Sequence, residues 1–139
     1  GLGLADLKEV TLYVDGAAKG NPGPAGIGVK IETDGQILTE HAGCIGTATN
    51  NVAEYHALIK GLQMAQELGA LRVAVVSDSE LMVRQLNGVY RVKNAALLSL
   101  YRQAKGLADG FERFRIRHVL RGENSDADRL ANEGILKGR

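Results

Sequence analysis

The sequence has 139 residues, which suits one compact domain, and its 17 basic and 16 acidic residues leave a formal net charge of +1. This balance excludes a strongly basic or acidic protein, so a charged binding surface has to come from the local distribution of charge. Cys44 is the only cysteine, which excludes an intramolecular disulfide and fits a reducing, cytoplasmic compartment. No apolar run approaches the ~20 residues of a membrane-spanning helix, so we expect no membrane association.

The first third of the chain predicts three strands, because β-branched residues alternate between turn signals. The predicted strands span residues 10–14, 27–33 and 36–45. Asp15-Gly16 ends the first strand, and residues 20–24 form a dense turn signal. Asp34-Gly35 is a pair typical of tight hairpins, so the second and third strands are expected to be antiparallel.

The rest of the chain alternates helices and strands. Predicted helices span residues 50–68, 79–86, 95–108 and 126–136, and predicted strands span 73–76 and 111–120. Asn50 or Asn51 is expected to cap the first helix, and Gly69 to stop it. The order predicts an α/β fold: a mixed five-stranded sheet, the first three strands antiparallel, strands 1, 4 and 5 parallel, helices on both faces. We expect a tail over residues 1–7 and one monomeric domain over residues 8–139.

Four acidic residues are placed to meet at one edge of this sheet. Asp15 and Asp78 follow the first and fourth strands, whose carboxyl ends meet at the same edge if the strands are parallel. Glu54 and Asp128 lie on apolar helix faces, where a carboxylate is costly unless it is paired or bound to a metal. Each acid taken alone also fits an ordinary role: a turn residue for Asp15, a helix cap for Asp78, and a first-turn acid for the other two.

Divalent cations would relieve the repulsion among four such acids, which have no obvious cationic partner in the sequence. An all-oxygen site suits Mg²⁺ or Mn²⁺. Two such ions, about 4 Å apart, can activate a water and stabilise the leaving oxygen of a phosphodiester.

Four local motifs make the pattern specific. They are residues 15–17 with 20–28 (DGA and GNPGPAGIG), 49–55 (TNNVAEY), 77–79 (SDS) and 124–132 (NSDADRLAN). Together, and in this order, they resemble the signatures of the type 1 ribonuclease H family over about residues 8–136, in a short form that lacks the family's basic protrusion.

The resemblance implies an endonuclease that hydrolyses the RNA strand of RNA–DNA hybrids with two Mg²⁺ ions, Mn²⁺ being a substitute, and leaves 5′-phosphate and 3′-hydroxyl ends. It implies that the catalytic and metal-binding acids are Asp15, Glu54, Asp78 and Asp128. The residues that it places against the substrate are Gly16, Ala17, Asn21, Thr49, Asn50, Asn51 and Ser79.

The sequence departs from the family pattern in the loop before the last acid. Arg121 stands nearest to the place where many members carry a histidine, and arginine cannot transfer a proton at neutral pH. Arg121 is therefore either an auxiliary residue that orients phosphate or a solvated loop charge. His118 is expected to pack within its strand.

Basic residues gather in two places. Residues 81–108 contain no acid but five basic residues, Arg84, Arg91, Lys93, Arg102 and Lys105, which suit either a phosphate-binding face or a solvated helical surface. Arg113, Arg115 and Arg117 alternate on the fifth strand and are expected to protect a sheet edge rather than bind substrate.

Two other functions stay open at this point. One is a nuclease of the same fold, such as an integrase or transposase core, against which the glycine-rich loop and the Asn50-Asn51 pair argue. The other is a hybrid-binding module without catalysis, against which the complete set of acids argues.

Overall fold

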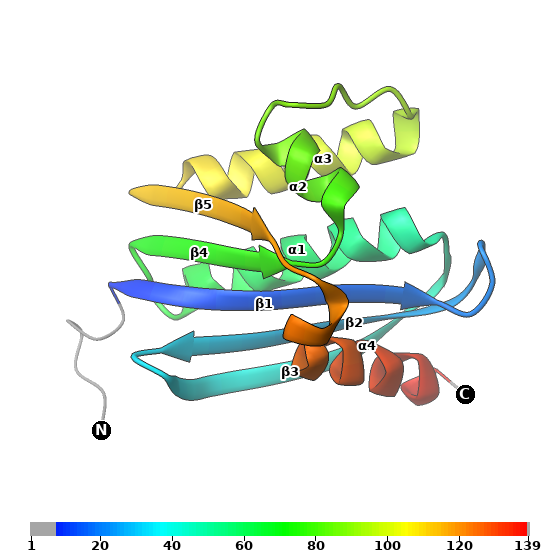
Figure 1. Cartoon of the computed structure of the whole chain (residues 1–139), viewed down its shortest axis with the longest axis horizontal. Coiled ribbons are helices and arrows are strands. Elements are labelled where there is room, and N and C mark those ends of the chain that lie inside the picture. Colours follow the sequence, from blue (N-terminus) through cyan, green and yellow to red (C-terminus); the bar gives the residue numbers. More distant parts are fainter. Residues whose placement is uncertain (1–7, 139) are drawn as a thin grey trace.

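Five strands form one mixed sheet in the order β3-β2-β1-β4-β5 (Figure 1). The computed structural model describes residues 8–138, so the tail expected over residues 1–7 lies outside the described residues. The strands are β1 (Glu9–Ala18), β2 (Gly23–Thr33), β3 (Gln36–Ala48), β4 (Arg72–Ser77) and β5 (Arg113–His118). The helices are α1 (Asn50–Glu67), α2 (Glu80–Leu86), α3 (Ala95–Asp109) and α4 (Ser125–Lys137), with a 3-10 helix, η2 (Arg121–Glu123), before α4.

The strand directions confirm the predicted α/β class. β1 pairs antiparallel with β2, and β2 with β3, whereas β1 pairs parallel with β4, and β4 with β5. Asp34 and Gly35, with φ of 49° and 76°, form the tight turn between β2 and β3 that their residue types predict. Across residues 8–138, no helix combines the length and the apolarity that crossing a membrane requires.

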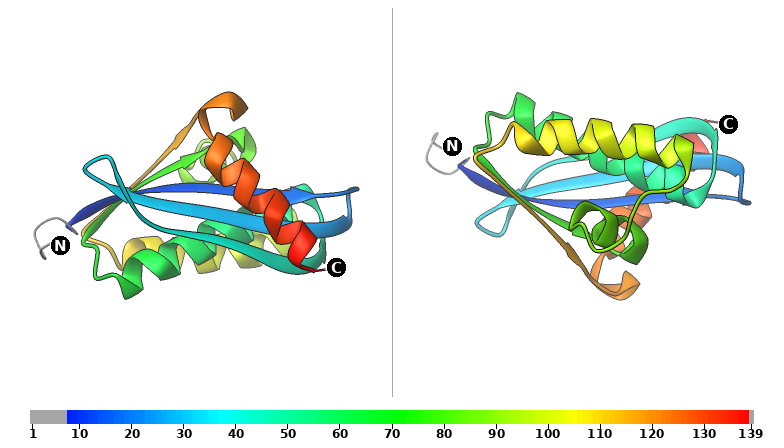
Figure 2. Two further views of the ribbon diagram at one scale, coloured as in Figure 1. Left: turned by 90° about the horizontal axis from the view of Figure 1, so that it is seen from below. Right: turned by 90° about the horizontal axis from the view of Figure 1, so that it is seen from above.

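Helices cover both faces of the sheet, as predicted: α1, α2 and α3 lie on one face, and α4 crosses the other (Figure 2). The core between the sheet and α1 contains fully buried side chains, including Leu12, Val29, Tyr55, Leu58 and Leu62. On the other face, α4 approaches β2 at Gly26 and Gly28, where an added methyl group would overlap the backbone of α4. These glycines therefore let α4 lie directly on the sheet.

The structure differs from the sequence prediction at the end of β1. Asp15 does not terminate this strand, because β1 continues to pair with β2 as far as Ala18. Its parallel pairing with β4 stops earlier, at Tyr13 and Val76. Asp15 therefore lies just beyond the point where β1 and β4 separate.

Other element boundaries also differ from those predicted. Thr49, not an asparagine, caps α1, because its Oγ1 accepts the backbone N–H of Val52 at 3.2 Å. β2 already includes Pro24, which the sequence placed in a turn. β5 is shorter than predicted, and His118 is exposed rather than packed, because it is the last residue of the strand.

Candidate active site

Three carboxylates from separate parts of the chain meet where β1 and β4 separate. Asp15 comes from β1, Glu54 from the first turns of α1, and Asp78 directly follows β4. Each offers one carboxylate oxygen, and these oxygens lie within 4.8 Å of one another. Asp15 is only 4% exposed. The predicted convergence of these three acids is thus present in the structure.

Local hydrogen bonds hold the residue after β4 at the edge of the sheet. The buried Ser77 accepts the backbone N–H of Ser79 at 3.0 Å, and Ser79 in turn accepts the N–H of Met82 at 3.3 Å as the cap of α2. The chain therefore turns sharply after β4. Asp78, between the two serines, faces the cluster instead of capping α2.

A glycine lets α1 approach β1 closely enough for Glu54 to reach Asp15. The backbone N–H of Gly16 donates to Glu54 Oε2 at 3.1 Å. A methyl group at Gly16 would overlap the backbone of Ala53 and Glu54. The conformation of Glu54 is thus fixed by the strand that carries Asp15.

Burial and mutual repulsion make these carboxyls weak acids in the absence of a cation. Burial, followed by the charges of Glu54 and Asp78, raises the pKa of Asp15 from 3.8 to about 10. Burial and then the charge of Asp78 raise the pKa of Glu54 from 4.5 to about 8, although the Gly16 N–H opposes this shift. A divalent cation would replace the protons, and a donor set made only of oxygens fits Mg²⁺ or Mn²⁺.

A pH-dependent effect of divalent cations on stability follows. The pKa values of Asp15 and of Glu54 in the folded protein lie above their ordinary values, so protonation of these groups stabilises the fold. This stabilisation is complete below about pH 4 and is lost as the pH rises to 8–10. We expect saturating Mg²⁺ to raise the melting temperature by several degrees at pH 9 and much less at pH 6. Thermal melts with and without Mg²⁺ measure this, and an equal shift at both pH values would contradict it.

The fourth predicted acid, Asp128, lines the same cleft but lies outside the group of three. This cleft has a volume of about 360 Å³ and is also lined by Lys19, Asn50, Arg121 and Asn132. Arg121 lies 3.3 Å from Asp128 Oδ1, and the two side chains are 77% and 29% exposed. The expectation that the acids have no cationic partner is therefore wrong for Asp128, because η2 brings Arg121 to the start of α4.

The residues predicted to contact a substrate fall into three groups. Gly16, Ala17 and Asn50 line the cleft. Asn21 and Thr49 hold the start of α1: Asn21 Oδ1 accepts the N–H of Asn50 at 3.0 Å, and Thr49 caps the helix. Asn51 and Ser79 do not line the cleft. Asn51 is exposed, and Ser79 caps α2.

Three polar residues in or beside the cleft have a place in the structure to which the sequence assigned no role. Lys19 follows no pattern that would place it there. Asn132 lies one helical turn after Asp128, and helical spacing alone predicts that the two share a face. Asn132 Nδ2 donates to the carbonyl of Asp128 at 2.9 Å. Asn124 is 1% exposed and donates from Nδ2 to the carbonyl of Val14 at 2.9 Å, and no sequence signal predicts that long-range bond.

Asn124→Ala is expected to destabilise the protein by about 2 kcal/mol and to lower activity, because the buried carbonyl of Val14 loses its donor next to Asp15. Asn87→Ala is a matched control, since Asn87 Nδ2 also donates to a carbonyl, that of Ile116, at 3.2 Å, but at an exposed position. Melting temperature and turnover measure both variants. Equal losses in the two would contradict the assignment.

The sheet order and the acid cluster are those of a ribonuclease H-like domain, and comparisons with known proteins agree. The family described as reverse transcriptase-like matches residues 13–134. A ribonuclease HI of Halobacterium salinarum is 42% identical over 128 residues, which cover 91% of this chain and 64% of that protein. The crystal structure of ribonuclease H1 from the same organism has a TM-score of 0.90 at 41% identity, covering 93% of this chain and 98% of that one.

Two further relatives complete the comparison. A bifunctional protein of Mycobacterium tuberculosis is 47% identical over 129 residues. The matched region covers 91% of this chain but only 35% of that protein. LC11-RNase H1, solved in complex with an RNA/DNA hybrid, has a TM-score of 0.88 at 42% identity, covering 93% of this chain and 98% of that one. The chain belongs to the ribonuclease H family. The predicted resemblance is thereby confirmed.

Proposed function

We propose that this protein hydrolyses the RNA strand of RNA–DNA hybrids with the help of two divalent metal ions. The observation that carries the proposal is the convergence of the carboxylates of Asp15, Glu54 and Asp78, which are costly to bury together without a cation. Membership of the ribonuclease H family and the hybrid bound to LC11-RNase H1 support the choice of substrate.

The chain's own residues have separate roles in this proposal. Asp15, Glu54 and Asp78 hold the metal ions, with Asp128 as the fourth acid, and the Gly16 N–H keeps Glu54 in position. Bound divalent ions lower the pKa of an attacking water and stabilise charge on the leaving oxygen. The water oxygen joins the phosphorus and the bond from phosphorus to the 3′ oxygen breaks, which leaves a 5′-phosphate and a 3′-hydroxyl. Arg121 orients the phosphate.

The surface around the cleft has groups suited to a nucleic-acid backbone. Gly16, Ala17 and Asn50 present backbone and amide groups at the cleft, and short polar groups of this kind bind phosphates and sugars without reading bases. On the α2–α3 side, Arg91, Lys93 and Arg102 are exposed and make no ion pair within residues 8–138. We propose that they contact the backbone of the hybrid farther from the cleft.

A panel of labelled substrates tests the proposal. With Mg²⁺, the protein is expected to cut the RNA strand of a hybrid and to leave duplex DNA intact, and end-labelling is expected to show 5′-phosphates. Cleavage of duplex DNA at a similar rate would favour an integrase-like nuclease, and hybrid binding without cleavage would favour a non-catalytic module. The monomeric state, the single domain over residues 8–139, the cytoplasmic location and the use of Mn²⁺ stay predictions.

A further inference from the structure

One face of β4 and β5 carries four arginines and no covering helix among the described residues. Phe114 and Ile116 of β5 pack toward the core, so the alternate residues of β5 point to the opposite face. α4 packs on β1, β2 and β3 and leaves this part of the sheet open (Figures 1 and 2). The four arginines are Arg72, Arg113, Arg115 and Arg117, which we call the arginine strip.

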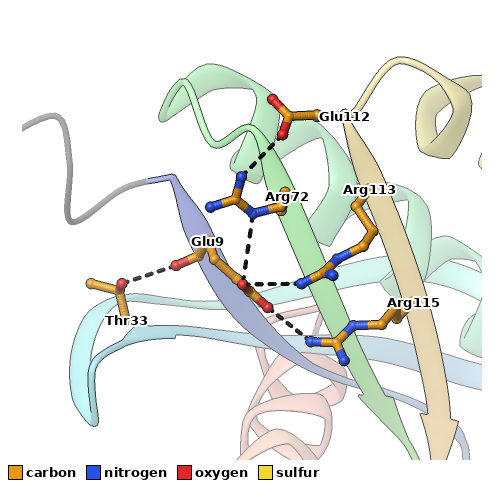
Figure 3. A network of polar contacts seen from close by, with 6 residues as sticks. All are labelled: Glu9, Thr33, Arg72, Glu112, Arg113 and Arg115. Carbon is orange, nitrogen blue, oxygen red and sulfur yellow. Dashed lines mark hydrogen bonds and ion pairs between the residues drawn. The ribbon is translucent and has the colours of Figure 1, made fainter.

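A single carboxylate orients most of the arginine strip (Figure 3). Glu9 of β1 lies 2.9 Å from Arg115, 3.5 Å from Arg113 and 3.8 Å from Arg72. Since β4 separates β1 from β5, the two β5 arginines reach across the sheet toward Glu9. β5 is an edge strand, as the sequence-based expectation requires, but the charged groups of Arg113 and Arg115 lie over the face of the sheet, and their protection of the edge stays a prediction.

The arginine strip keeps an excess of positive charge. Glu9 and Glu112, which lies 3.0 Å from Arg72, are its carboxylate partners, and Arg117 makes no ion pair within residues 8–138. Four guanidinium groups against two carboxylates leave two positive charges uncompensated. Guanidinium groups that are exposed and held in place suit phosphate oxygens, which they bind in a bidentate manner.

The strip begins beside the proposed active site. His118, the residue after Arg117, pairs with Ser77 of β4, and Asp78 of the carboxylate cluster comes next. Arg121 lines the cleft itself. A chain leaving the cleft at Arg121 could therefore continue along β5 past Arg117 and the rest of the strip. Over a few base pairs a duplex is too stiff to turn from the sheet edge onto the face, whereas a single strand is not.

We propose that the arginine strip binds the backbone of a single-stranded nucleic acid that continues from the hybrid in the cleft. The inference rests on the proposed function, and it adds a second binding surface outside the active site. Recognition is through phosphates, so it is independent of sequence and weakens as salt rises.

Steady-state cleavage of two substrates tests this surface: a blunt hybrid, and the same hybrid with a single-stranded tail of about ten nucleotides. For the unsubstituted protein in low salt, we expect KM for the tailed hybrid to be about fivefold lower than for the blunt one. Arg115→Gln together with Arg117→Gln is expected to remove this difference, with kcat and KM for the blunt hybrid unchanged. The contribution of the tail is the ratio of the two KM values, and its logarithm is plotted against the logarithm of the salt concentration. In the double variant, the slope of this plot is expected to be shallower by about 1.4.

A matched control removes two positive charges elsewhere: Arg129→Gln together with Lys137→Gln, both on α4. It is expected to keep the preference for the tailed substrate. Glu9→Gln has the opposite expected effect, a lower KM for the tailed hybrid alone, because the arginines lose a competing carboxylate. Arg117→Gln alone leaves the Glu9 ion pairs intact, so it reports on binding even if the double variant is unstable.

The proposal is overturned if the unsubstituted protein does not distinguish the two substrates, or if the arginine variants keep its preference. It is also overturned if the α4 control loses the preference equally. If the protein cleaves no hybrid at all, the proposed function fails, and the strip is tested separately by fluorescence anisotropy with a labelled single strand. In that assay, the arginine variants must bind more weakly than the unsubstituted protein and the α4 control.

Discussion

Asp15→Asn is expected to lower the rate of hybrid cleavage by about 1,000-fold or more, or roughly 4 kcal/mol of activation free energy, while the protein stays folded. The amide has the shape of the carboxyl group but no negative charge, so it holds a divalent cation poorly. Asp15 is the most buried of the three clustered acids and has the most strongly raised pKa. Its loss therefore removes the ligand at the centre of the site.

Circular dichroism and thermal melts separate this effect from unfolding. The variant's melting temperature at pH 8 without metal is expected not to fall, because this pH lies below the raised pKa of Asp15, so the amide replaces a neutral carboxyl group of the same shape. Asp109→Asn is the control: Asp109 is an exposed acid at the end of α3, with a weak ion pair to Lys105 at 3.9 Å. Asp109→Asn should leave cleavage unchanged. Substantial Mg²⁺-dependent cleavage by Asp15→Asn would refute the role assigned to Asp15.

Gly16→Ala is expected to destabilise the protein by about 3 kcal/mol and to abolish most activity. The new methyl group would overlap the backbone of Ala53 and Glu54, so α1 has to move away from β1. This movement breaks the hydrogen bond from Gly16 to Glu54 and withdraws Glu54 from the cluster. Stability and activity are thus expected to fall together.

Gly106→Ala is the matched control for this substitution. Gly106 lies within α3, and an added methyl group there would meet nothing within 4 Å. Alanine is the better helix former, so this variant is expected to gain about 1 kcal/mol of stability and to keep full activity. Urea unfolding measures both variants. A Gly16→Ala protein as stable as the parent would show that the contact between β1 and α1 is looser than described.

The parts of the site that follow from regular geometry could be predicted from the sequence. Asp15 and Asp78 each follow an apolar run of residues, and the parallel pairing of these two runs brings the acids to one place at the sheet edge. Glu54 lies one helical turn before Leu58 on an apolar stripe, which placed it on the face toward the sheet. The motif order then identified the family.

Contacts that depend on irregular segments could not be predicted. The pairing of Arg121 with Asp128 depends on η2, and a short 3-10 helix has no periodic signal. The extension of β1 beyond Asp15 depends on where two strands separate, which local residue types do not encode. The contact between Arg113 and Glu9 joins residues that are 104 positions apart in the sequence, and it depends on β4 lying between their two strands.

A crystal structure of the protein soaked with Mn²⁺, with anomalous scattering recorded to locate the metal, tests the main conclusion most directly. We predict anomalous peaks between the carboxylates of Asp15, Glu54 and Asp78, which disappear in crystals of Asp15→Asn. Manganese bound elsewhere, or no manganese in a protein that cleaves hybrids in the same Mn²⁺ buffer, would contradict it.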